Sequence, residues 1–196
     1  MSRVVLIDAG GANIGSVQYA LQRLGVDAPL TQDAALIRAA ERVILPGVGA
    51  AGPAMQRLRD AGLVEVVRGL IQPLLGVCVG MQVLFEHSEE GAVECLGLLS
   101  GQVRRLPEAS GVRIPHMGWN RLRRRRDSAL LDGIDDGAYA YFVHSFAVQD
   151  SDDAIATCAH GVEFAAVVER GNVTGAQFHP ERSAAVGARL LENFLR

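Results

Sequence analysis

The sequence lacks the long apolar runs and leader-like segments that mark several classes of protein. It contains no uninterrupted apolar stretch of about 18 residues, the length that a membrane-spanning helix requires. The first residues carry an apolar run that Asp8 ends at once, which is typical of a first β-strand and not of a secretory leader. We therefore expect a cytoplasmic protein with no membrane partner.

Cysteine is also scarce. Cys78, Cys95 and Cys158 are widely spaced and odd in number, which makes a disulfide framework improbable. There is no Cys-x-x-Cys pair and no tight group of histidines and cysteines, so the sequence predicts no structural zinc. We expect free thiols in a reducing compartment, and neither a metal nor a cofactor.

The composition is that of an ordinary globular protein. The chain has 196 residues, of which 49% are hydrophobic and 21% are charged, and it contains no linker or repeat. These values predict a single domain over residues 1–196. The net charge of −3 argues against a general polyanion binder, so we expect no nucleic-acid partner.

One stretch is strongly basic although the chain as a whole is acidic: residues 121–126 contain five arginines. Two interpretations stay open for this basic run. It could contact nucleic acid, or it could form a solvated turn or the rim of a site for an acidic partner. The second is favoured, because the chain is acidic and offers no aromatic platform beside the arginines.

Hydrophobic periodicity predicts an α/β fold. Short strands that are apolar on both faces alternate with amphipathic helices in the first half of the chain, which indicates a mostly parallel central sheet with helices on both faces. The predicted strands cover residues 3–8, 42–47 and 73–79, and the predicted helices cover residues 13–25, 53–71 and 80–88. Gly62 is expected to break or kink the second helix.

The second half of the chain has a different sequence pattern. Short β-rich runs separated by Gly, Asp and Asn turns predict antiparallel extensions of the sheet between residues 96 and 179. The chain ends with an amphipathic helix, for which Ser183 is the expected N-cap.

Cys78 lies between Gly76 and Gly80, where a buried strand is followed by a helix. Open α/β folds place their chemistry at this edge of the sheet, and the same strand–turn–helix arrangement forms the nucleophile elbow of Gly-x-Ser-x-Gly enzymes. Most lone cysteines are small buried core residues, and the Gly-x-Cys-x-Gly pattern in isolation favours neither interpretation over the other. A nucleophile also needs a base, so the histidines decide between the two interpretations.

His179 lies at the end of a predicted strand and is followed by Pro180 and Glu181. A strand end brings it to the same edge of the sheet as Cys78. A spacing of two along an extended stretch places His179 and Glu181 on one side. Glu181 could then accept a hydrogen bond from one imidazole nitrogen and leave the other for the thiol. Taken alone, this tripeptide more often marks a strand-end histidine beside a surface glutamate.

The two stretches Leu74–Gln82 and Gly175–Ser183 together resemble the class I, or triad-type, glutamine amidotransferases. The resemblance implies a flavodoxin-like glutaminase fold and glutamine as the substrate. It also implies that Cys78 is the nucleophile, that His179 is the general base and acid, and that Glu181 orients the histidine.

The resemblance further implies an oxyanion hole and a glutamine site. Gly47, Val48 and Gly49 match a loop that borders the oxyanion hole, in which the Val48 and Val79 amides are the candidate donors. Gln82, Ser145 and Phe146 match positions beside the bound glutamine, and Gly47 and Gly49 complete the predicted substrate-binding set. Without the resemblance, residues 46–49 are a plain glycine turn and residues 141–146 a half-buried strand.

Residues 114–120 and the C-terminal stretch are similar to a family member that forms a heterodimer with a cyclase subunit built as a (β/α)₈ barrel. This similarity implies a partner interface at four positions: Asn13, Trp119, Asn120 and Arg182. Three positions depart from the usual family pattern: Ala12, Gly15 and Arg182. Arg182 keeps the charge of the commoner lysine but not its hydrogen-bond geometry. Two alternatives remain: a glutaminase of another pathway, such as pyridoxal phosphate synthesis, and a non-catalytic regulatory subunit.

Overall fold

The computed structural model describes residues 3–10, 14–108 and 110–196. Within them, an eight-stranded sheet runs through the molecule in the order β2-β1-β3-β4-β14-β13-β12-β9. The first five strands of this order are parallel, and the last three are antiparallel to their neighbours. Their bounds are β1 Val4–Ile7, β2 Leu30–Thr31, β3 Arg42–Gly47, β4 Leu74–Cys78, β9 Arg123–Arg124, β12 Ala154–His160, β13 Val162–Arg170 and β14 Val173–Ala176.

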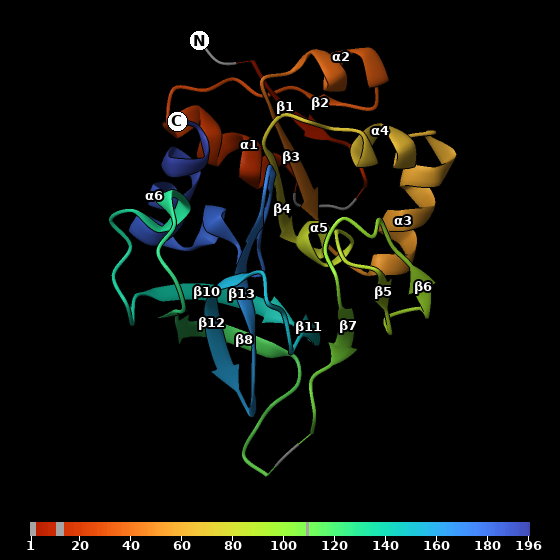
Figure 1. The fold of residues 1–196 in the computed structure, drawn as a ribbon. Coiled ribbons are helices and arrows are strands. Elements are labelled where there is room, and N and C mark those ends of the chain that lie inside the picture. Colours follow the sequence, from red (N-terminus) through yellow and green to blue (C-terminus); the bar gives the residue numbers. More distant parts are fainter. Residues whose placement is uncertain (1–2, 11–13, 109) are drawn as a thin grey trace.

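Helices cover both faces of this sheet (Figure 1), as the sequence predicts. In that view α1 (Ile14–Arg23) and α6 (Ala184–Phe194) lie to the left of the parallel strands, and α3 (Ala51–Asp60) and α4 (Val64–Arg68) lie to the right. Gly62, at φ 66°, lies between α3 and α4 and divides the single helix predicted over residues 53–71. The short α2 (Ala34–Ala39), which the sequence analysis does not predict, begins after Asp33, whose carboxylate caps it.

The second half supplies the antiparallel additions. One is a pair in which β8 (His116–Arg121) runs antiparallel to β10 (Tyr139–His144). The other is a four-stranded sheet of β11 (Phe146–Val148), β7 (Gln102–Arg105), β5 (His87–Ser88) and β6 (Val93–Glu94). Two 3₁₀ turns, η1 (Ala129–Leu131) and η2 (Pro180–Arg182), complete the described elements.

The helix predicted over residues 80–88 is wrong beyond its first turn, because α5 covers only Val79–Gln82. The following carbonyls bond to a distant segment and not to their own helix. The amides of Leu98 and Leu99 both donate to the Leu84 carbonyl, at 2.8 and 3.0 Å. Gly97 donates to the Phe85 carbonyl at 2.7 Å. Long-range pairing therefore wins over local helix propensity here.

Ser183 is the N-cap residue of α6, as predicted, but its hydroxyl makes no capping hydrogen bond. The Ser183 hydroxyl instead donates to the His179 carbonyl at 2.7 Å and accepts from the Tyr141 amide at 2.9 Å. It thereby fastens the start of η2 to β10.

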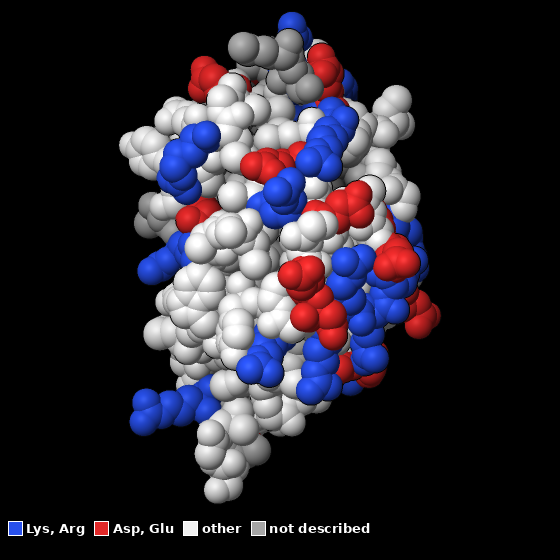
Figure 2. All heavy atoms as spheres, turned by 90° about the vertical axis from the view of Figure 1, so that its left-hand side faces the viewer, with Lys and Arg blue, Asp and Glu red and all other residues white. Residues whose placement is uncertain are grey.

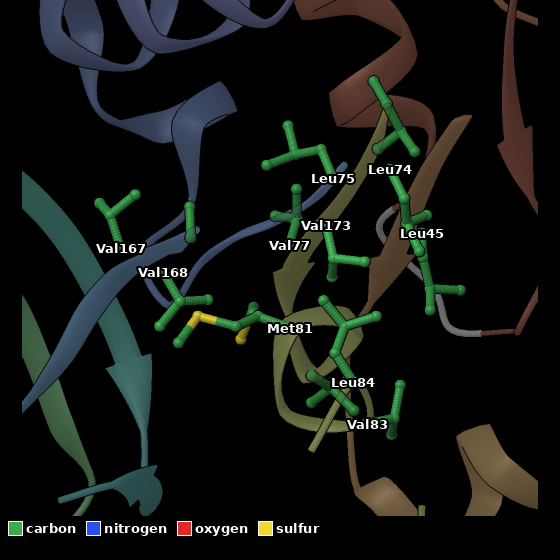
Figure 3. Close-up of a cluster of buried hydrophobic side chains, with 14 of the residues drawn as sticks. Leu45, Leu74, Leu75, Val77, Met81, Val83, Leu84, Val167, Val168 and Val173 are labelled. Atoms are coloured by element: carbon green, nitrogen blue, oxygen red, sulfur yellow. The ribbon is translucent and has the colours of Figure 1, made fainter. Parts of the chain in front are cut away.

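The core packs around β4 and its neighbours (Figure 3). Every residue of β1 and β4 is buried, as expected for strands covered on both faces. In Figure 3 the Met81 side chain extends from α5 towards Val168 of β13. This packing connects the parallel part of the sheet with its antiparallel part. No helix within the described residues is both long and apolar enough to cross a membrane.

Candidate active site

Cys78 ends β4 and directly precedes α5, so it occupies the turn between a strand and a helix. Its backbone adopts φ 54° and ψ −113°, a conformation that a residue with a side chain rarely adopts and that costs about 1–3 kcal/mol. A core cysteine needs no such strain. The observed turn is the geometry expected of a nucleophile elbow.

Three glycines allow the turn to pack closely against the sheet. A Cβ on Gly76 would lie 2.6 Å from the Gly80 carbonyl oxygen, and one on Gly80 would overlap the Leu45 carbonyl oxygen. A Cβ on Gly47 would lie 2.9 Å from the Val79 carbonyl carbon. Since these neighbours are backbone atoms, no side-chain movement could relieve the clashes, and only glycine fits.

His179 follows β14 and donates from Nδ1 to Glu181 Oε1 at 2.8 Å, with both side chains buried. The contact predicted from sequence is present, although Glu181 belongs to the 3₁₀ turn η2 and not to an extended stretch. The His179 amide also donates to the Tyr141 carbonyl at 3.0 Å. Because the carboxylate takes Nδ1, the second ring nitrogen, Nε2, remains for Cys78.

Two opposing influences set the pKa of His179. Burial alone would lower it, but the hydrogen bonds to Cys78 and Glu181, and the negative charges of the two groups, raise the pKa of His179 to about 10. The imidazole is therefore protonated at neutral pH, and it faces the Cys78 sulfur. A cysteine held beside an imidazolium is in the kind of setting that favours nucleophilic attack by sulfur.

These groups open into a cavity of about 320 Å³. Most of the residues predicted from sequence line it, together with several that were not predicted. The lining consists of Val48, Gly49, Cys78, Val79, Gln82, Glu90, Pro115, Val143, His144, Ser145, Phe146, His179 and Arg182. Gly47 is paired with Cys78 between β3 and β4, outside this lining, and Glu181 lies behind His179.

The sequence analysis does not find two polar residues of the site. Glu90 lines the cavity, and its Oε2 accepts from the Ala51 amide at 3.1 Å. Burial raises the pKa of Glu90, and the Ala51 amide opposes this rise. Gln177 is fully buried and donates from Nε2 to Cys78 Sγ at 3.8 Å. A glutamine inside an apolar strand-like run was the available signal for Gln177.

Within the described ranges, no group of three or more His, Cys, Asp and Glu side chains is arranged to hold a metal ion. The side chains brought together are a cysteine sulfur, an imidazolium and a carboxylate. Such a set is suited to the attack of sulfur on a carbonyl carbon, followed by proton transfer to the leaving group.

Of the predicted interface positions, Arg182 lines the cavity, Trp119 and Asn120 lie on β8, and Asn13 lies outside the described residues. Trp119 is 52% exposed on β8, where its ring contacts Tyr141 edge-on. Arg182 stacks over the Tyr141 ring at 4.7 Å and lines the cavity. The Asn120 amide is turned inwards, because Nδ2 bonds to His116 and to the Ala159 carbonyl.

Local partners occupy most of the basic run at residues 121–126. Arg124 bonds to the Ile134 carbonyl and Asp127, Arg125 pairs with Glu163, and Arg126 donates to the Glu169 carbonyl. On the face drawn in Figure 2, arginine and carboxylate side chains lie interspersed. These contacts favour a solvated surface segment over a nucleic-acid site.

Comparisons with known proteins identify the family of this chain. The family described as "Glutamine amidotransferase class-I" matches residues 5–196. The imidazole glycerol phosphate synthase subunit HisH of Xanthomonas axonopodis pv. citri is 64% identical, with 100% of this chain and 98% of that protein covered. The HisH of Xylella fastidiosa (strain Temecula1) is 60% identical over the same shares of the two chains.

Solved structures give the same fold at lower identity. PurLQS from Thermotoga maritima superposes with a TM-score of 0.72 at 22% identity, covering 100% of this chain and 98% of that one. The glutaminase domain of Trypanosoma brucei CTPS with bound acivicin gives 0.67 at 16% identity, covering 100% and 94%. Because the family match spans nearly the whole chain and the HisH relatives cover all of it, the chain belongs to the class-I glutamine amidotransferase family and, within it, to the family of the imidazole glycerol phosphate synthase subunit HisH.

Proposed function

We propose that this chain is the glutaminase subunit of imidazole glycerol phosphate synthase, the enzyme of histidine biosynthesis for which its relatives are named. It hydrolyses glutamine to glutamate and ammonia and passes the ammonia to a cyclase subunit. The observation that carries the proposal is the strained Cys78 beside the buried His179–Glu181 pair, in one cavity of a chain 64% identical to a HisH protein.

The first step is the attack of the Cys78 thiolate on the side-chain amide carbon of glutamine. A C–S bond forms, and the carbonyl π electrons move to oxygen, which becomes an oxyanion. Val79 opens α5 and Val48 lies at the cavity wall, so their amide N–H groups are the proposed donors to this oxyanion. One such donor is typically worth about 3 kcal/mol of transition-state stabilisation.

His179 supplies the proton that the leaving group needs. The protonated imidazole, with its pKa raised to about 10 by Cys78 and Glu181 in spite of burial, donates from Nε2 to the departing nitrogen as the C–N bond breaks. Ammonia leaves, and a γ-glutamyl thioester remains on Cys78. The neutral imidazole then takes a proton from a water molecule whose oxygen attacks the thioester, which releases glutamate and restores the ion pair.

The cavity also offers acceptors for the amino-acid end of glutamine. Glu90 presents a carboxylate at the wall, which suits the substrate α-ammonium group. Gln82 has a buried Oε1 with no protein partner among the described residues, so this oxygen is available to a donor on the substrate. We assign both residues to glutamine binding, with the backbone of Ser145 and Phe146 opposite.

The outer face of the β8–β10 pair is the proposed docking surface for a barrel-shaped cyclase subunit. Strand register places Tyr141 opposite Trp119 and Val143 opposite Met117, so these four side chains share one face. Met117 is 63% exposed and Trp119 is 52% exposed. Val143 also lines the cavity, so ammonia released there lies close to the partner. Sequestration matters because free ammonia in water at neutral pH is mostly ammonium, which is not a nucleophile.

The test of the chemistry is a glutaminase assay of the complex with the cyclase subunit and its nucleotide ligand. Cys78→Ala should abolish glutamate release, because no other group in the cavity can form the thioester. Glu181→Gln, which keeps the shape but removes the charge, should lower kcat. Glutamate release by Cys78→Ala at the wild-type rate would refute the proposal.

Two other functions are separated by simple observations. A non-catalytic subunit would not be alkylated at Cys78 by acivicin, whereas an active glutaminase would. A glutaminase of another pathway would be activated by a different synthase subunit, so activation by the imidazole glycerol phosphate cyclase assigns the pathway. The identity of 60–64% to HisH proteins supports that assignment.

The docking surface is tested by Trp119→Ala. Removing a large exposed aromatic from the centre of an interface typically costs about 2 kcal/mol, or roughly 30-fold in Kd. We expect that weakening in calorimetric titration with the cyclase, with the folded stability of this chain unchanged. Leu36→Ala, at a 46% exposed apolar residue of α2, is the matched control and should bind normally. Equal Kd values for the two variants would exclude this face.

A further inference from the structure

Two buried histidines that the mechanism does not use lie at the glutamine cavity: His144 is part of its wall, and His116 bonds to His144 from outside the lining. His144 ends β10, and His116, opposite it in register, begins β8. Their rings are joined by a hydrogen bond of 3.0 Å between His116 Nδ1 and His144 Nε2. The simplest interpretation is a pair of core histidines whose hydrogen-bonding groups all have partners. The order of donors and acceptors around them, however, also bears on side chains that line the cavity.

The partners fix the proton positions on both rings. His144 Nδ1 lies 2.9 Å from the Phe146 carbonyl, which can only accept, so Nδ1 carries the proton and Nε2 is an acceptor. His116 Nδ1 must therefore donate to it. His116 Nε2 then accepts from Asn120 Nδ2, at 3.1 Å, and the same nitrogen of Asn120 donates to the Ala159 carbonyl at 3.0 Å. All donors point the same way, towards Phe146.

Burial agrees with this assignment. It is the main reason that the pKa of His144 falls to about 3 and that of His116 to about 4, so both rings are neutral at physiological pH. A proton on either ring would place two donors face to face, which the chain of partners cannot accommodate.

The chain continues from Phe146 to the nucleophile. The Phe146 carbonyl accepts a second bond, from Gln82 Nε2 at 2.8 Å, and the other hydrogen of that nitrogen goes to Gln177 Oε1 at 3.0 Å. Gln177 then turns its Nε2 to Cys78 Sγ, at 3.8 Å. Both amides thus have one permitted orientation: Gln82 keeps an unused oxygen, and Gln177 presents a donor to the sulfur.

We propose that His116 and His144 are positioning residues that hold the Phe146 carbonyl in place, and through it the Gln82 and Gln177 side chains and the glutamine site. The proposal rests on the function proposed above and adds a role for two residues outside the triad. Neither histidine reacts. Their task is to hold the Phe146 carbonyl in place, so that the Gln82 oxygen is presented to the substrate and the Gln177 nitrogen to the thiolate.

The kinetic test uses the complex with the cyclase subunit and its nucleotide ligand. His116→Leu keeps the bulk of the ring but removes the donor to His144, so the KM for glutamine should rise about tenfold while kcat stays within about threefold. His116→Asn keeps an amide donor at the position of Nδ1 and should restore most of the affinity. A uniform loss of folding would instead lower the active fraction and leave KM unchanged.

The matched control is His160→Gln. The His160 ring stacks on His116 with centroids 4.1 Å apart, and its Nε2 bonds to the Arg113 carbonyl, but it is no link of the chain. This variant should keep the wild-type KM. If it raises KM as much as His116→Leu does, ring packing and not the hydrogen-bond chain is responsible, and the proposal is overturned.

A spectroscopic measurement needs no variant. In the complex with only this chain ¹⁵N-histidine labelled, two-bond ¹H–¹⁵N correlation spectra report the tautomer of each ring. We expect two neutral rings protonated on Nδ1 that do not titrate between pH 5 and 8. An Nε2–H tautomer on either ring, or a wild-type KM for His116→Leu in an active complex, would overturn the inference. An inactive wild-type complex would instead overturn the proposed function.

Discussion

Backbone strain at Cys78 is the residue-level feature that separates a nucleophile from a core cysteine. All three cysteines are buried, so burial does not distinguish them. Burial raises the pKa of Cys95 to about 11 and that of Cys158 to about 12, which makes both thiols inert. Cys78 alone among them has a positive φ and contacts an imidazolium.

Strain stored for function can be released by substitution. Glycine adopts φ 54° without a cost in free energy, whereas alanine adopts it only at such a cost. Cys78→Gly should therefore be more stable than Cys78→Ala by about 1 kcal/mol. At an unstrained site the order is the reverse. Urea unfolding of the two inactive variants measures this difference. If the alanine variant is the more stable one, the turn is not strained.

Sequence reasoning could group Cys78, His179 and Glu181 because each of them lies in a short motif with its own local geometry. It did not find the His116–His144 chain, whose members are 28 residues apart. Their contact depends on the register in which β10 pairs with β8, and no local pattern in either strand specifies that register. Gln177 and Glu90 were missed for the same reason, since their roles depend on distant partners.

At the level of elements, the junction of β4 and α5 packs closely against the backbone of β3 beside the site. The sequence predicted this junction well, because glycines at positions 76 and 80 on either side of a cysteine are typical of a tight strand–turn–helix elbow. It overpredicted the helix that follows, because the apolar run from Val83 to Phe85 is equally compatible with a buried turn. Long-range bonds from residues 96–99 decided that outcome.

The junction makes a clear stability prediction. Gly80→Ala would drive a Cβ into the Leu45 carbonyl oxygen, and since both groups are backbone-fixed, we expect a loss of at least about 3 kcal/mol or a failure to fold. Gly52→Ala is the control, because a Cβ there meets nothing within 4 Å. In the first turn of α3 that change should add about 0.5 kcal/mol. Denaturant unfolding that ranks Gly80→Ala near wild type would contradict the packing.

Over the whole molecule, the buried neutral histidines connect stability to pH. In the unfolded chain a histidine titrates near pH 6.5, whereas burial lowers the pKa of His116 to about 4 and that of His144 to about 3 in the fold. Between these values the unfolded chain binds more protons than the folded one. Their contribution to stability is therefore complete above pH 6.5 and is lost as the pH falls towards 4.

This linkage predicts that the free energy of unfolding falls between pH 6.5 and 5, at up to about 1.4 kcal/mol per pH unit for each histidine. Glu90 acts in the opposite sense, because burial raises its pKa and acid then favours the fold, so the comparison ends at pH 5. His116→Leu removes one of the two histidines with a lowered pKa, so the unfolding free energy of the variant should depend less steeply on pH. The other titrating groups are the same in both proteins, so their effects cancel when the two curves are compared. Urea unfolding of both proteins at pH 7, 6 and 5 measures this dependence. Parallel curves would mean that His116 takes up a proton as readily in the folded protein as in the unfolded chain, and the one-way order of donors from Asn120 to the Phe146 carbonyl could not then hold.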